Sequence, residues 1–406
     1  MTVQMNTGTD MTDANAFRSE VRAWLEDNCP LSQRQPIVRE EQIWAGKRRQ
    51  FPSEDAQRWF EAMCDRGWTA PEWPTEYGGG GLSPEQARIL QQEMTRLHCR
   101  PPLYDMGLWM LGPALLEFGN EQQKATHLPR IVRGEARWAQ GYSEPGAGSD
   151  LASLKTRADD CGDHFLVNGT KIWTTRADVA DWIFCLVRTD PNVPKQQGIS
   201  FLLIDMESEG VSTAPIKLIS GESEFCQTFF DNVKVPKENL VGTLNGGWAV
   251  AKELLKHERK LMGTMEAITE KVDVGIVDLA HEYADINAHG EVADSSLRMA
   301  MVNHLMNDAA MQHLNERLYY QHKAGAPDPR LGMLIKHIGT KELQSKDEVI
   351  LKILGADGLS WDNPSAKPEV HRMVRNWAYD KAHTIAGGTS EIQLNIIAKR
   401  ALGLAD

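Results

Sequence analysis

The sequence predicts an α+β protein with three domains: an N-terminal α-helical domain (residues 1–135), a central small β-barrel or β-sandwich domain (136–240) and a C-terminal four-helix bundle (241–406). Three observations support this order. In the first part, apolar residues recur at helical spacing. The middle part consists of short β-rich runs separated by Pro, Gly and Asp clusters. The last part contains long helical stretches joined by short breaks, which is typical of an antiparallel bundle.

The composition is that of a globular protein, with 41% hydrophobic and 25% charged residues among 406. The net charge of −12 argues against nucleic acid or an anionic membrane as the main partner. The chain has no apolar run of transmembrane length and does not start with the pattern of a secretory signal, so a cytoplasmic location is predicted. Six cysteines without CxxC spacing predict free, mostly buried thiols rather than a zinc site or disulfides.

The first domain is predicted to contain helices with clear ends. An apolar stripe forms a first helix that Pro30 ends, and a second amphipathic helix follows. Ser83 then caps a third helix, with Pro84 at its first position and Gln86 placed for a capping box. The apolar positions of the first two helices are Phe17, Val21, Trp24, Leu25, Trp59, Phe60 and Met63.

The central domain is predicted from its β-rich runs at residues 182–187, 199–204 and 228–235. A hairpin is also predicted at Asn168-Gly169, because this dipeptide suits the positive φ angles of a two-residue turn. The strand that leaves this turn presents Trp173, Thr174 and Thr175 in sequence.

The polar loop Ser143–Asp150 precedes this predicted hairpin. A flat redox cofactor needs an aromatic wall, hydrogen-bond donors at its ring and a polar loop for its phosphates. Trp173, Thr175 and the loop fit these needs. From the residues alone the alternative stays open, because a Trp on a strand is more often a core residue and a Ser/Gly loop is more often only a turn.

The C-terminal region is predicted to become helical after Asn245-Gly246-Gly247, to break at residues 287–294 and 325–329, and to enter its last helix from Gly387-Gly388. Its first helix carries Lys-His-Glu-Arg-Lys at residues 256–260. By pattern alone, this cluster is a solvated helix face with i,i+4 charge pairs.

The loop Ser143–Asp150, followed by Asn-Gly-x-Lys-x-Trp-x-Thr at residues 168–175, closely resembles the signature of the acyl-CoA dehydrogenase family of flavoproteins. Further similar segments, such as Trp-Pro-x-x-Tyr-Gly-Gly at residues 73–79, extend the resemblance over most of the chain. It implies the same order of three domains, with FAD between the β domain and the C-terminal bundle. It also implies a homotetramer built as a dimer of dimers, in which one subunit completes the cofactor site of another.

The resemblance further implies FAD-dependent α,β-dehydrogenation of an acyl-CoA thioester to the trans-2-enoyl-CoA, with electrons passed to an electron-transfer flavoprotein. This reaction needs a carboxylate base in a dry site. In many members the base is a Glu before Gly-Thr near the C-terminus, where this chain has Gly387. In other members it precedes an Arg on the first long helix of the bundle, which Glu258 and Arg259 match. Glu258 is therefore predicted to be the catalytic base.

The same resemblance implies roles for other residues and no metal site. The cofactor-binding positions are Gln140, Ser143, Trp173, Thr175, Thr389 and Glu391, and the substrate-binding positions are Ser149 and Arg259. For Thr389 and Glu391, simple helix capping is an equally open alternative.

Two segments depart from the family pattern. Residues 286–294 lack the Arg-x-x-Phe-Gly segment that contacts the partner subunit's FAD, and residues 352–356 read Lys-Ile-Leu-Gly-Ala instead of Gln-x-Leu-Gly-Gly. They leave open a divergent branch of the family, or a non-catalytic subunit of a hetero-oligomer with a related subunit. Some relatives of the same fold are flavin monooxygenases or oxidases; these often lack the catalytic Glu, so Glu258 favours dehydrogenation. The missing C-terminal Glu favours the branch that accepts bulky, branched or ring-bearing acyl groups, so β-oxidation of fatty acids or steroid side chains is the expected context.

Overall fold

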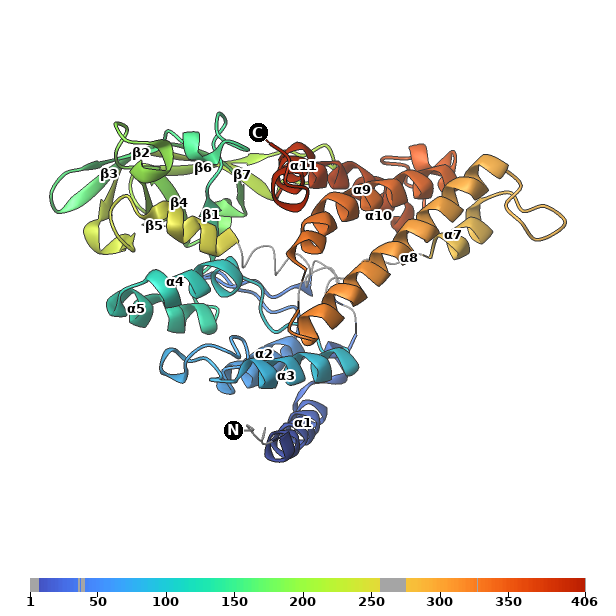
Figure 1. The fold of residues 1–406 in the computed structure, drawn as a ribbon, viewed down its shortest axis with the longest axis horizontal. Coiled ribbons are helices and arrows are strands. Elements are labelled where there is room, and N and C mark those ends of the chain that lie inside the picture. Colours follow the sequence, from blue (N-terminus) through green and yellow to red (C-terminus); the bar gives the residue numbers. More distant parts are fainter. Residues whose placement is uncertain (1–6, 36, 38–40, 256–274, 327, 406) are drawn as a thin grey trace. The chain divides into compact units, whose positions relative to one another are not determined.

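The computed structural model describes residues 7–35, 37, 41–255, 275–326 and 328–405, and Figure 1 shows its fold. The described residues form two compact units, each with its own hydrophobic core. The first unit comprises the described residues of Met1–Ile216 and Glu224–Lys271, and the second those of Lys217–Ser223 and Val272–Asp406.

The N-terminal part of the first unit is helical, as predicted. Its α-helices are α1 (Thr7–Asn28), α2 (Glu54–Asp65), α3 (Pro84–Arg96), α4 (Gly112–Phe118) and α5 (Glu121–Val132). The predicted capping box is confirmed, since the Gln86 backbone N–H donates to Ser83 Oγ at 3.2 Å and the Ser83 backbone N–H donates to Gln86 Oε1 at 3.0 Å. These two bonds satisfy N–H groups that the first turn of a helix cannot pair internally.

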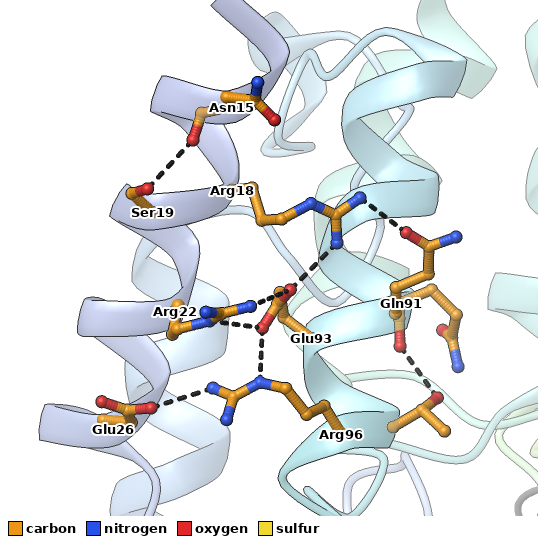
Figure 2. A network of polar contacts seen from close by, with 10 residues as sticks. Asn15, Arg18, Ser19, Arg22, Glu26, Gln91, Glu93 and Arg96 are labelled. Atoms are coloured by element: carbon orange, nitrogen blue, oxygen red, sulfur yellow. Dashed lines mark hydrogen bonds and ion pairs between the residues drawn. The ribbon is translucent and has the colours of Figure 1, made fainter.

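A buried carboxylate joins α1 to α3. Glu93 on α3 is 2% exposed and accepts hydrogen bonds from Arg18 and Arg22 of α1 and from Arg96 of its own helix, at 2.9, 3.0 and 2.7 Å (Figure 2). These charged donors, with Arg22 the strongest, outweigh the effect of burial and lower the pKa of Glu93 to about 2. The same helices also share an apolar cluster.

The rest of the first unit is built around a sheet of eight strands in the order β6-β7-β3-β2-β4-β5-β8, with β1 paired to β4. This confirms the predicted central β domain. The strands are β1 (Trp138–Gly141), β2 (Arg157–Asp160), β3 (His164–Thr175), β4 (Trp182–Arg188), β5 (Ile199–Asp205), β6 (Val211–Ile216), β7 (Phe225–Pro236) and β8 (Leu240–Val241).

Strand β4 is buried on both faces, which explains its unbroken apolar sequence. Phe184 and Leu186 belong to the core that the sheet shares with α4 and α5, which lie against it in Figure 1. Ile183, Cys185 and Val187 alternate with them and belong to a second core within the β part. The sheet and the N-terminal helices therefore form one packed body.

The hairpin predicted at Asn168-Gly169 is wrong. Strand β3 continues through both residues and pairs with β2 and β7. Glycine is needed at 169 because a Cβ there would lie 2.5 Å from Thr156 Oγ1. The turn between β2 and β3 lies instead at Gly162, with φ 90°, where the Gly162 N–H donates to Asp160 Oδ1 at 2.9 Å.

The second unit is helical, as predicted for the C-terminal part. Its α-helices are α7 (Ile276–Tyr283), α8 (Ser295–Lys323), α9 (Pro329–Leu354), α10 (Pro368–Asp380) and α11 (Ser390–Ile396). The predicted breaks before α8, α9 and α11 are confirmed, and α7, α8, α9 and α10 share one core. Residues 247–255, in the first unit, are also helical. Among the described residues, no helix has the length and apolar character to cross a membrane.

We expect Glu93→Gln to lower the free energy of unfolding by about 1–3 kcal/mol, because three guanidinium groups lose their charged acceptor. The pKa of Glu93 is depressed from 4.5 to about 2 in the folded state. Its contribution is therefore present above pH 4.5 and is lost as the pH falls toward 2. Urea unfolding of both proteins across that pH range measures the difference.

Glu26→Gln is the matched control. The Glu26 side chain is 47% exposed and accepts one hydrogen bond from Arg96 at 2.9 Å, so we expect a loss below about 0.5 kcal/mol. Equal losses in the two variants would contradict the assigned role of Glu93.

Candidate functional site

The polar loop Ser143–Asp150 follows β1 and is tied to β3. The Ile172 backbone N–H of β3 donates to the Ser143 carbonyl oxygen at 2.9 Å. The chain then turns tightly, and the backbones of Glu144 and Ala147 exchange two N–H···O=C bonds of 3.0 Å each. The loop is therefore held beside the end of β3 that carries Trp173.

A buried ion pair fixes this arrangement. Lys171 on β3 is 0% exposed, and its Nζ donates to Glu144 Oε1 at 2.8 Å and to the Tyr142 carbonyl oxygen at 3.0 Å. The Glu144 carboxylate also accepts the backbone N–H groups of Lys155 at 2.6 Å and Thr156 at 2.8 Å. Burial raises the pKa of Glu144, but the Lys171 ammonium and the N–H donors outweigh burial and hold the pKa below its ordinary value. The carboxylate is therefore ionised at neutral pH.

Trp173 lies in a β-bulge of β3. The pairing register with β7 shifts between Lys171 and Thr174, which leaves an extra residue on β3. Trp173 has a φ of 61°, in the left-handed region, where an aromatic residue stores about 1–2 kcal/mol of strain. Its side chain is 52% exposed and meets Phe225 edge-on, with ring centroids 6.1 Å apart. A strained and exposed tryptophan stabilises the fold little, so its ring is available to a ligand.

The other cofactor positions predicted in the first unit lie on elements near this strand end. Gln140 is on β1, which contacts β3, Ser143 is in the loop and Thr175 is the last residue of β3. All three are half-buried, and their side chains have no hydrogen-bond partner among the described residues. Thr174 instead points into the sheet, where its hydroxyl donates to a β7 carbonyl oxygen at 2.9 Å. The predicted substrate residue Ser149 is exposed in the loop.

Thr389 and Glu391 lie in the second unit, at the start of α11. Thr389 is the N-cap, and its Oγ1 accepts the Ile392 backbone N–H at 3.3 Å. The pKa of Glu391 is lowered, first by a backbone N–H and then by the Thr389 hydroxyl. Lys336 steadies the preceding turn, because its Nζ donates to the Gly388 carbonyl oxygen at 2.7 Å. Helix capping accounts for both predicted residues in this unit.

Glu258 and Arg259 lie outside the described residues, which stop at residue 255 and resume at residue 275. The structure therefore brings together Ser143, Trp173 and Thr175 in the first unit, and Thr389 with Glu391 in the second.

Sequence reasoning assigned no role to Glu144 or Lys171, although both belong to the quoted motif. The sequence did contain a signal that the Lys171 side chain is buried. Phe165, Val167 and Lys171 lie an even number of residues apart in one strand, so their side chains point to the same, buried face. A lysine at an inward position needs a carboxylate partner.

Three family models match the chain along most of its length. They are the acyl-CoA dehydrogenase N-terminal domain at residues 11–135, the acyl-CoA dehydrogenase middle domain at 139–233 and the acyl-CoA dehydrogenase C-terminal domain at 245–402.

The curated relatives are also acyl-CoA dehydrogenases. IpdE1 of Mycobacterium tuberculosis is 32% identical over 97% of this chain and 98% of its own length. FadE34 of the same organism is 35% identical over 84% of this chain, but the match spans only 45% of FadE34.

Among solved structures, the protein described as Tcur3481-Tcur3483 steroid ACAD superposes with a TM-score of 0.73 at 28% identity, over 100% of both chains. The ChsE4-ChsE5 complex from Mycobacterium tuberculosis gives a TM-score of 0.70 at 26% identity, also over 100% of both chains.

We expect Lys171→Met to lower the free energy of unfolding by about 3–5 kcal/mol, because it leaves the Glu144 carboxylate buried without a counter-charge. The double variant Glu144→Gln/Lys171→Met removes both charges, and it should recover part of this loss. Urea unfolding of the two single variants and the double variant gives the coupling energy.

Lys195→Met is the control, since Lys195 pairs with Asp150 at 2.7 Å with both side chains more than half exposed. It should cost less than about 1 kcal/mol. A Lys171→Met variant as stable as Lys195→Met would show that the buried pair does not fix the loop.

Proposed function

The chain belongs to the acyl-CoA dehydrogenase family, and on this premise we propose that it uses FAD to convert an acyl-CoA thioester to the trans-2-enoyl-CoA and passes the electrons to an electron-transfer flavoprotein. Trp173 carries this proposal. It is strained at φ 61° and 52% exposed, so neither backbone preference nor packing explains a tryptophan there. A flat ligand against its ring does explain it.

The residues of the first unit fit a flavin. FAD, when bound, supplies the acceptor for the hydride that leaves the β carbon of the substrate. Within the described part of the chain, the hydroxyls of Ser143 and Thr175 and the side chain of Gln140 have no partner, so they could hydrogen-bond to its ring. The ion pair of Glu144 with Lys171 holds these groups in place before a ligand arrives.

The glycines of the loop give a second indication of fit. A Cβ at Gly146 or Gly148 would meet no atom within 4 Å, and neither residue has a positive φ. Neither packing nor backbone conformation therefore requires glycine at these positions. A ligand that approaches the backbone closely would require it. Ser149, next in the loop, is the residue that we propose for the CoA part of the substrate.

We propose Glu258 as the base that removes the α proton and Arg259 as a substrate contact. Their support is the sequence match to the family, together with Gly387 at the other position where the family places its base. Thr389 and Glu391 are proposed to contact the phosphate or adenosine half of FAD in addition to capping α11. The domain boundaries near residues 135 and 240 are part of the same proposal, as is a cytoplasmic location.

The comparisons suggest the substrate and the assembly. The similar structures include one described as a steroid ACAD and one described as the ChsE4-ChsE5 complex, and a further relative is specific for short or branched chains. We therefore propose a bulky acyl group, branched or ring-bearing, with a steroid side chain as the leading candidate. We also propose an oligomer, either a dimer of dimers of this chain or a hetero-oligomer with a related subunit.

One observation favours a second candidate, a subunit that depends on a different partner chain. Residues 286–294 contain no arginine, and they form a short turn closed by a β-bridge between Ile286 and Val292. The Asn287 side chain accepts the backbone N–H groups of His289 at 2.9 Å and Glu291 at 3.1 Å within this turn. The hydrogen bonds of this segment are thus made within the turn. Without an arginine, residues 286–294 cannot donate from a guanidinium group to the FAD of a partner subunit.

An anaerobic visible spectrum before and after adding a panel of acyl-CoA thioesters tests the proposal. A flavin spectrum that one class of thioester bleaches supports dehydrogenation and identifies the acyl class. A flavin that no thioester bleaches favours other flavin chemistry. A protein that stays colourless when FAD is supplied favours the partner-dependent subunit.

We expect Glu258→Gln to keep its flavin spectrum and to reduce flavin about 100 to 10,000 times more slowly with the active thioester, because the α proton loses its acceptor. Stopped-flow absorbance under anaerobic conditions measures this rate. Glu253→Gln, five residues earlier in the sequence and without a proposed role, should react at the wild-type rate. If Glu258→Gln reduces flavin at the wild-type rate, another residue must be the base.

We expect Trp173→Gly to raise the dissociation constant of FAD about tenfold or more while changing the stability of the FAD-free protein by less than about 1 kcal/mol. The ring contributes to stacking, whereas glycine relieves the backbone strain. Titration calorimetry and urea unfolding measure the two quantities. Asn232→Gly is the matched control, because Asn232 has a φ of 54° on β7 and its variant should leave FAD affinity unchanged. Equal FAD affinities in Trp173→Gly and wild type would remove Trp173 from the site.

A further inference from the structure

Arg188, the last residue of β4, holds the segment that follows the loop Ser143–Asp150. Its side chain is half-buried. Nη2 donates to the carbonyl oxygens of Ala152 at 2.6 Å and Leu154 at 3.4 Å, and Nη1 donates to the carbonyl oxygen of Lys195. No carboxylate of the described residues is hydrogen-bonded to this guanidinium. Arg188 therefore uses its donors to bind the backbone instead of an acidic side chain.

The segment that follows the loop needs these donors. Leu151–Ser153 form a short 3-10 turn, and the last carbonyl oxygens of such a turn have no partner within it. The Arg188 side chain supplies donors there, and its backbone N–H donates to the Thr156 carbonyl oxygen at 2.7 Å. The Glu144 carboxylate accepts the N–H groups of the two residues before β2. Residues 152–156, the loop exit, are thus held by Arg188 through carbonyl groups and by Glu144 through N–H groups.

An arch of exposed residues, 148–150, precedes the loop exit. The backbone N–H and the hydroxyl of Ser153 both donate to the Asp150 carbonyl oxygen, at 3.0 and 2.7 Å, so the arch is joined directly to the exit. The backbone N–H groups of the arch and the Ser149 hydroxyl have no partner among the described residues. The arch thus presents a row of donors to the solvent, and such donors suit the oxygen atoms of a phosphate group.

We propose that Arg188 is a positioning residue for the phosphate part of CoA, because it holds the loop exit against the sheet and thereby fixes where the donors of the arch lie. This role rests on the proposed function, in which Ser149 contacts the CoA part of the substrate. Lys171 anchors the start of the loop, beside Ser143 and the proposed flavin contacts. Loss of Arg188 should therefore leave the flavin bound and weaken the recognition of CoA.

CoA has a chemical division that tests this role. Its pantetheine arm carries the thioester, and its phosphate groups lie at the end remote from the reacting carbon atoms. Contacts to a remote part of a substrate contribute to catalysis only when that part is present and correctly held. A pantetheine thioester with the same acyl group lacks the phosphate groups, so it cannot lose the contacts that Arg188 positions.

The test measures kcat/KM of the full-length, FAD-containing protein for an acyl-CoA that bleaches the flavin and for the pantetheine thioester of the same acyl group. In Arg188→Met, we expect kcat/KM to fall about tenfold for the acyl-CoA and less than about twofold for the pantetheine thioester. The flavin spectrum should stay unchanged. A general loss of structure would instead lower both kcat/KM values by the same factor.

Arg157→Met is the matched control. Arg157 lies beside Arg188 in the parallel register of β2 and β4, and its 63% exposed side chain pairs with Asp159 at 3.1 Å. This variant removes the same charge at a neighbouring position, so the two kcat/KM values should keep their wild-type ratio. Arg188→Lys keeps the charge but loses the fork of donors that reaches two segments. It should show a smaller loss for the acyl-CoA alone, and it replaces Arg188→Met if that variant does not fold.

Ser149→Ala shows whether Arg188 acts through the arch. It should lower kcat/KM for the acyl-CoA alone, and adding Arg188→Met should then cost less than it does in the wild-type background, because one positioned donor is already missing. Equal losses for the two thioesters in Arg188→Met, or no loss for either, would overturn the positioning role and leave the proposed dehydrogenation intact. A protein that oxidises no thioester would overturn both.

Discussion

The candidate site depends on the buried ion pair between Glu144 and Lys171. The pair gathers three segments, because the carboxylate accepts N–H groups from the two residues before β2 while Nζ of β3 donates to the carbonyl oxygen of Tyr142 after β1. Two charges taken out of water are costly, and well-packed apolar residues often stabilise a core as well as a buried pair does. An apolar contact, however, would let the loop slide along β3. The buried carboxylate and ammonium groups must keep all their hydrogen bonds, and only one position of the loop on β3 allows this. The pair therefore specifies the geometry of the loop more than it adds to the stability of the fold.

The strain at Trp173 follows from this fixed position. Lys171 is anchored by Glu144, and Thr174 is anchored to β7 through its hydroxyl. Between these anchors β3 carries one residue more than β7 can pair. One residue of β3 therefore stays unpaired and bulges out of the β-ladder. In this bulge, Trp173 takes a φ of 61°. The strain of about 1–2 kcal/mol is a noticeable fraction of a typical folding free energy of roughly 5–15 kcal/mol. The two anchors keep it from relaxing.

Features determined by neighbours in sequence were predictable, and features that depend on distant segments were not. The capping box at Ser83 and the three-domain pattern were predicted, since caps and periodicity are local. The Asn168-Gly169 prediction failed because Gly169 serves a close approach to Thr156 across the sheet. The motif identified Trp173 as a candidate residue. It could not predict the backbone strain there, because the bulge depends on pairing with β7. The ion pair of Lys171 could not be predicted as a pair, because its partner Glu144 is 27 residues away in the sequence.

The position of the base can be argued from backbone as well as from sequence. Gly387 has a φ of 64° and Gly388 a φ of 95°, so two successive residues take conformations that side chains disfavour. Lys336 stabilises this turn through the Gly388 carbonyl oxygen. A Glu at residue 387 would therefore adopt a strained backbone in a turn that Lys336 already fixes. The turn thus suits glycine and disfavours a Glu, which agrees with our proposal of Glu258 as the base.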